Sequence, residues 1–285
     1  MVKPAGRRKA AGQLRTDYEI SERRASKVMK LHRSTMRYIG RPDDSQALRK
    51  EFQEMAAKYP RYGYRMMTDK LRFQGWKVNH KRVYRLYREE TLQLPKRRRK
   101  RLRNLARQPI VLPDSLNQRW SMDFVADTLA DGRRFRTLNV LDDFSRECLA
   151  IEVAISIPGE RVTRVLDQIA TLRGYPQAIV IDNGPEFTGR ALDGWASQHQ
   201  VKLQFIQPGK PVQNAFIESF NDKFRSEHLN SNWFLHIWEA RRSIEAWRNE
   251  YNHERPHSSI GRIPPAIYAE SLLKEPNLVT STTDQ

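Results

Sequence analysis

Apolar residues recur at helical spacing in the first third of the chain and at strand-like spacing after residue 118. Ala25, Val28 and Met29 share one helical face, the pattern breaks at residues 31–33, and a second short helix is expected from Ser34. Two short helices joined in this way predict a helix-turn-helix, although an ordinary helical hairpin with a solvated basic face has the same pattern. The residues expected near the start of the recognition helix are Arg33, Ser34, Thr35 and Arg37.

Three more helices are predicted between residues 43 and 94. The first begins at Asp43-Asp44-Ser45 and is ended by Pro60, and its buried face is expected to contain Leu48, Phe52, Met55 and Ala56. The second covers residues 64–74 and is ended by Gly75, and the third is capped by Asn79. Its outward basic residues form a second candidate DNA-binding face: Lys81, Arg82, Arg85 and Arg88.

Runs of apolar and β-branched residues predict strands at 120–126, 134–141 and 148–155, which would form a three-stranded meander. Helices are then expected at 158–172 and about 186–200, strands at 178–181 and 201–206, and a long helix around Glu218. Consecutive strands followed by strands that alternate with helices predict an α/β fold with a mixed sheet covered by helices. Apolar residues further along are expected to pack onto this sheet: Trp233, Phe234, Trp238, Ile244 and Trp247.

The chain has 51 lysines and arginines against 33 aspartates and glutamates, and its net charge of +18 favours a polyanionic partner. Residues 1–108 contain 32 basic and 10 acidic residues, whereas the remaining 177 contain 19 and 23. The basic third is therefore expected to attract nucleic acid, and the rest to hold a site that needs carboxylates. Six consecutive basic residues predict an extended linker that binds phosphate, with a solvated hinge as the alternative: Lys96, Arg97, Arg98, Arg99, Lys100 and Arg101.

Cys148 is the only cysteine, which excludes an intramolecular disulfide and a multi-cysteine zinc site. No signal peptide and no apolar run of membrane-spanning length is visible, so we expect a cytoplasmic protein without a membrane partner. The patterns divide the chain into six segments. They are a helix-turn-helix segment at 1–42, a second helical DNA-binding region at 43–94, a basic linker at 95–114, a catalytic core at 115–230, a helical extension at 231–273 and a disordered tail at 274–285.

Three acidic residues are the candidates for catalysis: Asp123, Asp182 and Glu218. The aspartates lie in or at the end of apolar, strand-like runs, where an unpaired charge is costly unless a cation or hydrogen bonds offset it. In the predicted sheet they would lie on neighbouring strands, with Glu218 on the facing helix. Two-metal phosphodiester transfer needs such carboxylates, and magnesium takes few carboxylates and several waters. The triad is therefore predicted to bind two Mg²⁺ ions, with Mn²⁺ as a substitute, and to cut and join DNA.

Other acidic residues have simpler interpretations. Asp142 and Asp143 are expected in a tight hairpin, where aspartate side chains bond to the backbone. Glu186 is expected to cap a helix, although it could assist a metal ion.

Basic residues near the predicted triad also have two interpretations. Arg225 lies two helical turns after Glu218, where it would hold a DNA phosphate or pair with Asp222. Arg255 and His257 are expected to anchor a turn, with a DNA contact as the alternative.

Five motifs together resemble one known family. They are Trp-Ser-Met-Asp-Phe at 120–124, Leu-Asp-Asp-Phe-Ser-Arg at 141–146, Asp-Asn-Gly-Pro-Glu-Phe at 182–187, Asn-Ala-Phe-Ile-Glu-Ser-Phe at 214–220 and Tyr-Asn-His-Glu-Arg-Pro-His at 251–257. Their order, with 35 residues between Asp182 and Glu218, resembles the OrfB-type insertion-sequence transposases of bacteria. The catalytic core of that family has the ribonuclease H-like fold, which it shares with retroviral integrases, and the upstream helices resemble its helix-turn-helix region.

The resemblance implies that Asp123, Asp182 and Glu218 are catalytic metal ligands and that Arg225 matches a basic residue of the family. It implies nicking at the element ends, followed by direct attack of the freed 3′-hydroxyl on another phosphodiester. The implied partners are double-stranded DNA, as element ends and target, and further copies of the chain on paired ends. An upstream-frame, OrfA-type partner or fusion is also implied, as is association with the nucleoid.

Two other functions remain open. A catalytically silent helix-turn-helix regulator of the element would need only the helices, but an intact triad at this spacing argues against it. A ribonuclease H-like nuclease would cut RNA in hybrids, but the helical pairs and the basic linker favour duplex DNA.

Overall fold

The computed structural model describes residues 4–38, 45–95, 112–184, 186–206 and 214–274. The chain divides into two compact units, residues 1–52 and 53–285, with the boundary inside one helix. None of the helices within these ranges is long and apolar enough to cross a membrane.

The first unit contains α1 (Pro4–Asp17), α2 (Glu22–Val28), α3 (Arg33–Met36) and the first half of α4 (Ser45–Lys58). The two short helices predicted at residues 21–40 are present as α2 and α3. Ser21 caps α2 by accepting a hydrogen bond from the Arg24 amide at 3.3 Å, and Nδ1 of His32 accepts one from the Ser34 amide at 3.4 Å. The sequence did not predict α1, because it has little apolar periodicity and Ala11 is its only buried hydrophobic residue among those described.

The helical part of the second unit consists of the end of α4, α5 (Tyr64–Phe73) and α6 (His80–Glu89). The expected apolar face of α4 is buried at Leu48, Phe52, Met55 and Ala56. Gly75 follows α5 with a φ of +92°, a left-handed conformation that glycine adopts without strain. Asn79 caps α6 by accepting a hydrogen bond from the Lys81 amide at 2.9 Å.

The sheet consists of β1 (Arg119–Thr128), β2 (Arg134–Asp142), β3 (Cys148–Ala154), β4 (Ala178–Ile181) and β5 (Lys202–Phe205). Their order is β3-β2-β1-β4-β5. The first three strands pair antiparallel, whereas β4 is parallel to both β1 and β5. This confirms the predicted mixed α/β sheet and places β1 and β4 side by side.

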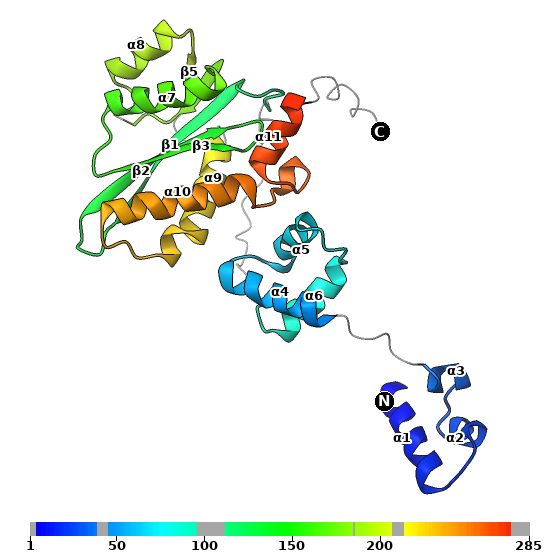
Figure 1. Ribbon diagram of the computed structural model, residues 1–285. Helices are drawn as coiled ribbons and strands as arrows, with labels where there is room; N and C mark the ends of the chain where they lie inside the picture. Colours follow the sequence, from blue (N-terminus) through cyan, green and yellow to red (C-terminus); the bar gives the residue numbers. More distant parts are fainter. Residues whose placement is uncertain (1–3, 39–44, 96–111, 185, 207–213, 275–285) are drawn as a thin grey trace, which may run out of the picture. The chain divides into compact units, whose positions relative to one another are not determined.

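Helices cover both faces of the sheet (Figure 1). On one face α7 (Gly159–Arg173) and α8 (Arg190–Gln198) form a core with Trp120 and Met122 of β1. On the other, α9 (Ala215–Glu227) and α10 (Ile237–His253) form a core with Val125. Alternate residues of β1 therefore point to different cores.

The remaining chain contains two short 3₁₀ helices, Leu229–Ser231 and Ser258–Ile260, and ends in α11 (Pro265–Lys274). Phe234, Ile244 and Trp247 lie in the second core, as predicted. The same prediction is wrong for Trp233 and Trp238, which are 85% and 57% exposed. Trp233 precedes α10 and Trp238 lies in its first turn, so helical spacing alone did not tell the buried face from the exposed one.

Candidate active site

Asp123 lies in the middle of β1, on the face that α9 covers. It is half-buried, and both of its carboxylate oxygens have a hydrogen-bond donor. Oδ1 accepts from the backbone N–H of Phe124 at 2.8 Å, and Oδ2 accepts from Nδ2 of Asn221 at 2.7 Å. These two donors fix the direction of the carboxylate.

Asp182 directly follows β4, the neighbouring strand of β1. Its Oδ1 accepts a hydrogen bond from the backbone N–H of Gly184 at 3.0 Å. A Cβ at position 184 would lie 2.9 Å from that oxygen, closer than such atoms approach in proteins. The glycine therefore leaves the space that the Asp182 carboxylate occupies.

Glu218 lies exposed in the first turn of α9, where it completes the acidic group. The pKa of Asp123 is raised to about 6, mainly by burial and also by the charges of Asp182 and Glu218, while the hydrogen bonds from Phe124 and Asn221 lower it. Partial burial also raises the pKa of Glu218, with a contribution from Asp222. Asp182 and Glu218 are thus close enough to act electrostatically on Asp123, as carboxylates do around a cation site.

Two asparagines that the sequence analysis did not single out join β2, α9 and β1. Nδ2 of Asn139 donates to Oδ1 of Asn221 at 2.7 Å, and Asn221 in turn donates to Asp123. Asn139 is fully buried and lies directly opposite Asp123 in the β1–β2 ladder. Because Asn221 follows Glu218 by three positions, helical spacing could have placed it on the same face, but its link to Asn139 depends on the strand register.

Two predicted neighbours of the triad have partners of their own. Nη2 of Arg225 donates to the carbonyl of Ala126 at 3.3 Å, and within the described ranges no ion pair joins it to Asp222. Glu186 does not begin a helix, because α8 starts at Arg190 after Gly189. It instead forms an ion pair with Arg136 of β2, beside the turn that holds Asp182, and this interaction lowers its pKa.

The two adjacent aspartates after β2 have different roles. Asp142 accepts hydrogen bonds from the amides of Phe144 and Ser145, as expected for a turn residue. Asp143 does more than form a turn, because it is buried and accepts from the Ser121 hydroxyl and from Nε of Arg119. It therefore fixes the first residues of β1, the strand that carries Asp123.

Carboxylates from two adjacent inner strands of the sheet and from the facing helix form an oxygen-donor set of the kind that Mg²⁺ takes. Over the described part of the chain, no three His, Cys, Asp or Glu side chains already stand in a geometry that holds a metal ion. The donor chemistry and the raised pKa of Asp123 nevertheless fit a divalent cation, whose charge would offset the repulsion among the carboxylates.

Apart from Arg225, the predicted DNA-contacting residues lie far from this acidic group in the sequence. In the first unit Arg33 and Arg37 both pair with Glu22, at 3.6 and 2.9 Å, while remaining more than half exposed. In the same unit Ser34 bonds to Nδ1 of His32 at 2.7 Å and Thr35 is half-buried. On α6 the side chains of Lys81, Arg85 and Arg88 are exposed. Arg82 is half-exposed. The basic run from Lys96 to Arg101 lies outside the described residues.

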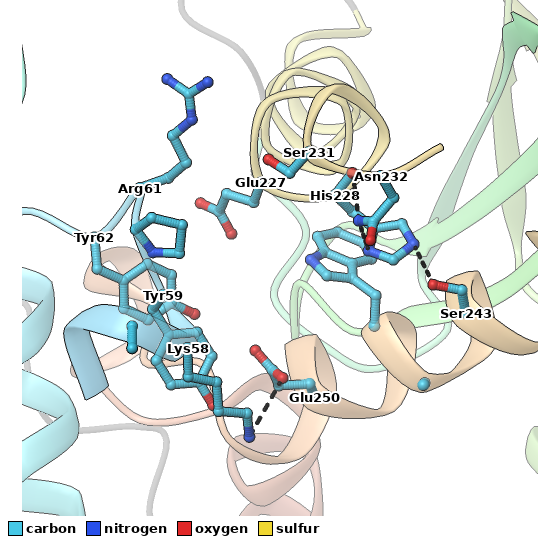
Figure 2. A pocket seen from close by; sticks show the side chains of 14 residues that line it. Lys58, Tyr59, Arg61, Tyr62, Glu227, His228, Ser231, Asn232, Ser243 and Glu250 are labelled. Carbon is cyan, nitrogen blue, oxygen red and sulfur yellow. Dashed lines mark hydrogen bonds and ion pairs between the residues drawn. The ribbon is translucent and has the colours of Figure 1, made fainter. Parts of the chain in front are cut away.

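A pocket of about 400 Å³ is lined by the end of α4 and the segment after it, the end of α9 and one side of α10 (Figure 2). Tyr59 and Tyr62 stack on one side of it, with ring centroids 4.6 Å apart, and His228 lies on the other. Burial lowers the pKa of His228 to about 4, so this side chain is neutral at physiological pH. None of the three candidate catalytic carboxylates lines the pocket.

Ion pairs connect α5 to the segment that follows α10. Lys70 pairs with Glu254 at 3.0 Å, and Arg262 pairs with Asp69 at 2.7 Å. Arg255 is buried and makes two hydrogen bonds to Glu227 of α9, at 2.8 and 2.6 Å. These contacts support the interpretation of Arg255 as an anchor.

Comparison with known proteins gives a family for this fold and this acidic group. Two models named integrase core domain match residues 113–211 and 199–265, and an HTH-like domain matches residues 43–101. The 31.7 kDa protein of insertion element IS407 from Burkholderia multivorans is 46% identical over 257 residues, which cover 90% of this chain and 93% of that protein. InsK of insertion sequence IS150 from Escherichia coli, whose name describes a candidate transposase, is 25% identical over 91% of this chain and 96% of its own length.

Among solved structures, the HTLV-2 integrase catalytic core in complex with magnesium aligns with 54% of this chain and 96% of that chain, at 17% identity and a TM-score of 0.41. The sequence matches define the class: insertion-element proteins with an HTH-like region and an integrase core. This chain belongs to the OrfB-type insertion-sequence transposase family.

Proposed function

We propose that this protein is a DNA transposase that cuts the ends of an insertion element and joins them to new DNA with Asp123, Asp182 and Glu218. The observation that carries the proposal is the convergence of three carboxylates from β1, the end of β4 and α9, close enough for Asp182 and Glu218 to raise the pKa of Asp123. A structural role explains such a grouping poorly, because acids brought this close together destabilise the fold unless a cation binds them.

The carboxylates would hold Mg²⁺, with Mn²⁺ as a substitute. When bound, the metal supplies activation of the attacking hydroxyl and stabilisation of the leaving oxygen in phosphodiester exchange. Other groups of the chain would orient these carboxylate ligands. The amide of Phe124 and Asn221 orient Asp123, the amide of Gly184 orients Asp182, and α9 presents Glu218.

The reaction we propose is hydrolytic nicking at the element ends, followed by attack of the freed 3′-hydroxyl on another phosphodiester. Arg225, exposed and bonded to the end of β1, would contact a phosphate of the bound strand. The basic residues of the helical region and linker would bind double-stranded DNA of the ends and target. We further propose that copies of the chain assemble on paired ends, with an upstream-frame, OrfA-type partner or fusion.

The test is to express the gene inside its native flanking DNA, with any upstream frame intact, and to amplify outward across excised circular junctions. The wild type and Glu270→Gln, which neutralises an exposed acid on α11, are expected to give junctions, and Glu218→Gln none. Equal junctions from Glu218→Gln would overturn the proposed mechanism. No junctions from any variant, with protein made and DNA bound, would favour a regulator of the element.

A further inference from the structure

A second group of charged residues lies on the flank of α9 that faces away from Asn221. Arg146 belongs to the turn between β2 and β3, Lys223 to α9, and Arg255 and His257 to the segment after α10. Their charges act on one another, because Arg255 and Arg146 lower the pKa of Lys223, and all three lower the pKa of His257. Four groups that can carry positive charge therefore share one small region.

Lys223 is half-buried, and among the described residues its ammonium group bonds only within its own helix. Nζ donates to the carbonyl and to the hydroxyl of Ser219, at 3.1 and 2.8 Å. In the described ranges no carboxylate lies within 4 Å of it to form an ion pair. Burial lowers the pKa of Lys223 to about 8, and the more distant charges of Glu227 and Asp222 only partly oppose this fall. An ammonium group in such surroundings is stabilised when an anion binds.

Arg146 has an unused donor beside the same helix. Its guanidinium carbon lies 3.6 Å from the centre of the Phe216 ring, in the first turn of α9. Its Nη1 is buried and makes no hydrogen bond to any described residue. A buried donor without an acceptor costs free energy, which an acceptor that reaches it would recover.

Two acidic residues near this group already have cationic partners. Glu227 binds Arg255 through both oxygens, and Asp143 pairs with Arg119 at 2.6 Å. The sequence of residues 207–213, which precedes α9, contains Lys210 and no carboxylate. The nearby carboxylates therefore offset the positive charge of Lys223 and Arg146 only in part, and a bound anion would match the rest.

We propose that Lys223, Ser219 and Arg146 bind a backbone phosphate of the DNA strand that reaches the carboxylate triad. Ser219 directly follows Glu218 and both are exposed, so a strand bound at Glu218 can also reach Ser219. An ammonium, a hydroxyl and a guanidinium supply the donors that a phosphodiester accepts, without reading base sequence. The inference rests on the proposed function, because it adds a position for the substrate of that same reaction.

Lysine footprinting of the full chain tests the site directly. The Glu218→Gln protein is labelled with an amine-reactive reagent alone, with duplex DNA carrying an element end, and with inorganic phosphate at an equal phosphate concentration. Mass spectrometry then compares Lys223 with Lys202, an exposed lysine on the edge strand β5. We expect DNA to protect Lys223 and leave Lys202 labelled. Unchanged labelling of Lys223 while Lys81 is protected would overturn the proposal, and equal protection by inorganic phosphate would overturn DNA as the ligand.

DNA affinity measured at several salt concentrations gives a second readout. Loss of one phosphate contact in Lys223→Gln is expected to weaken binding roughly five- to tenfold at about 0.1 M salt and to reduce the salt slope by about 1. Lys223→Arg should retain both values, and Lys202→Gln should match the parent. An unchanged slope in Lys223→Gln, with an unchanged melting temperature, would contradict the site. Failure of the proposed function can be told apart from failure of this phosphate site, because it would appear as junctions formed by Glu218→Gln.

Discussion

At the scale of single residues, the candidate site depends on groups that have no charge of their own. The backbone N–H of Gly184 donates a hydrogen bond to Asp182. Because Gly184 has no side chain, it also leaves room for the Asp182 carboxylate. Its φ is not in the left-handed region, so an alanine would meet only the steric conflict with that oxygen. We expect Gly184→Ala to displace the Asp182 carboxylate and to reduce junction formation roughly a hundredfold, with little change in melting temperature.

Gly194 provides the matched control. It lies inside α8, and a Cβ built there would meet nothing within 4 Å. Gly194→Ala should therefore leave activity unchanged and stabilise the protein by about 0.5–1 kcal/mol, because alanine loses less conformational entropy in a helix. Equal activity of the two alanine variants in the junction assay would show that the space at Gly184 is not needed.

At the scale of elements, the sequence predicted all five strands and the helix that carries Glu218, because runs of apolar residues mark the strands and differ from the helical spacing elsewhere. It also predicted that Asp123 and Asp182 lie on neighbouring strands, which the parallel pairing of β1 and β4 confirms. The link from Asn139 through Asn221 to Asp123 could not be predicted. It requires both the β1–β2 register and the rotation of α9, which tertiary packing sets.

The position of α9 also depends on its far end, where Glu227 meets Arg255. The pair is buried, with side-chain exposures of 13% and 6%, so removal of one partner leaves a buried charge. We expect Arg255→Met to lower the free energy of unfolding by about 3–5 kcal/mol, and Glu227→Gln combined with Arg255→Met to recover most of that loss. Urea denaturation of both variants measures the difference. An equal loss in the single and double variants would mean that Arg255 stabilises the fold through packing on Tyr62 and Tyr251, not through Glu227.

At the scale of the whole chain, charge separates DNA attraction from chemistry. The first 108 residues contain 32 basic and 10 acidic residues, and the remaining 177 contain 19 and 23, so the part that holds the triad has no general attraction for DNA. The run from Lys96 to Arg101 is the densest block of positive charge and joins the two parts in sequence.

If all six residues of this run contact phosphates, replacing them with glutamine should reduce the salt slope of DNA binding by about 5. Arginine-to-lysine replacements in the same run keep the charge and should keep the slope, because the released counterions depend on charge and not on side-chain shape. Fluorescence anisotropy on one duplex across a salt series measures both variants. A slope that stays unchanged in the glutamine variant would place the electrostatic contacts on the helices alone and leave this run as a connection between them and the core.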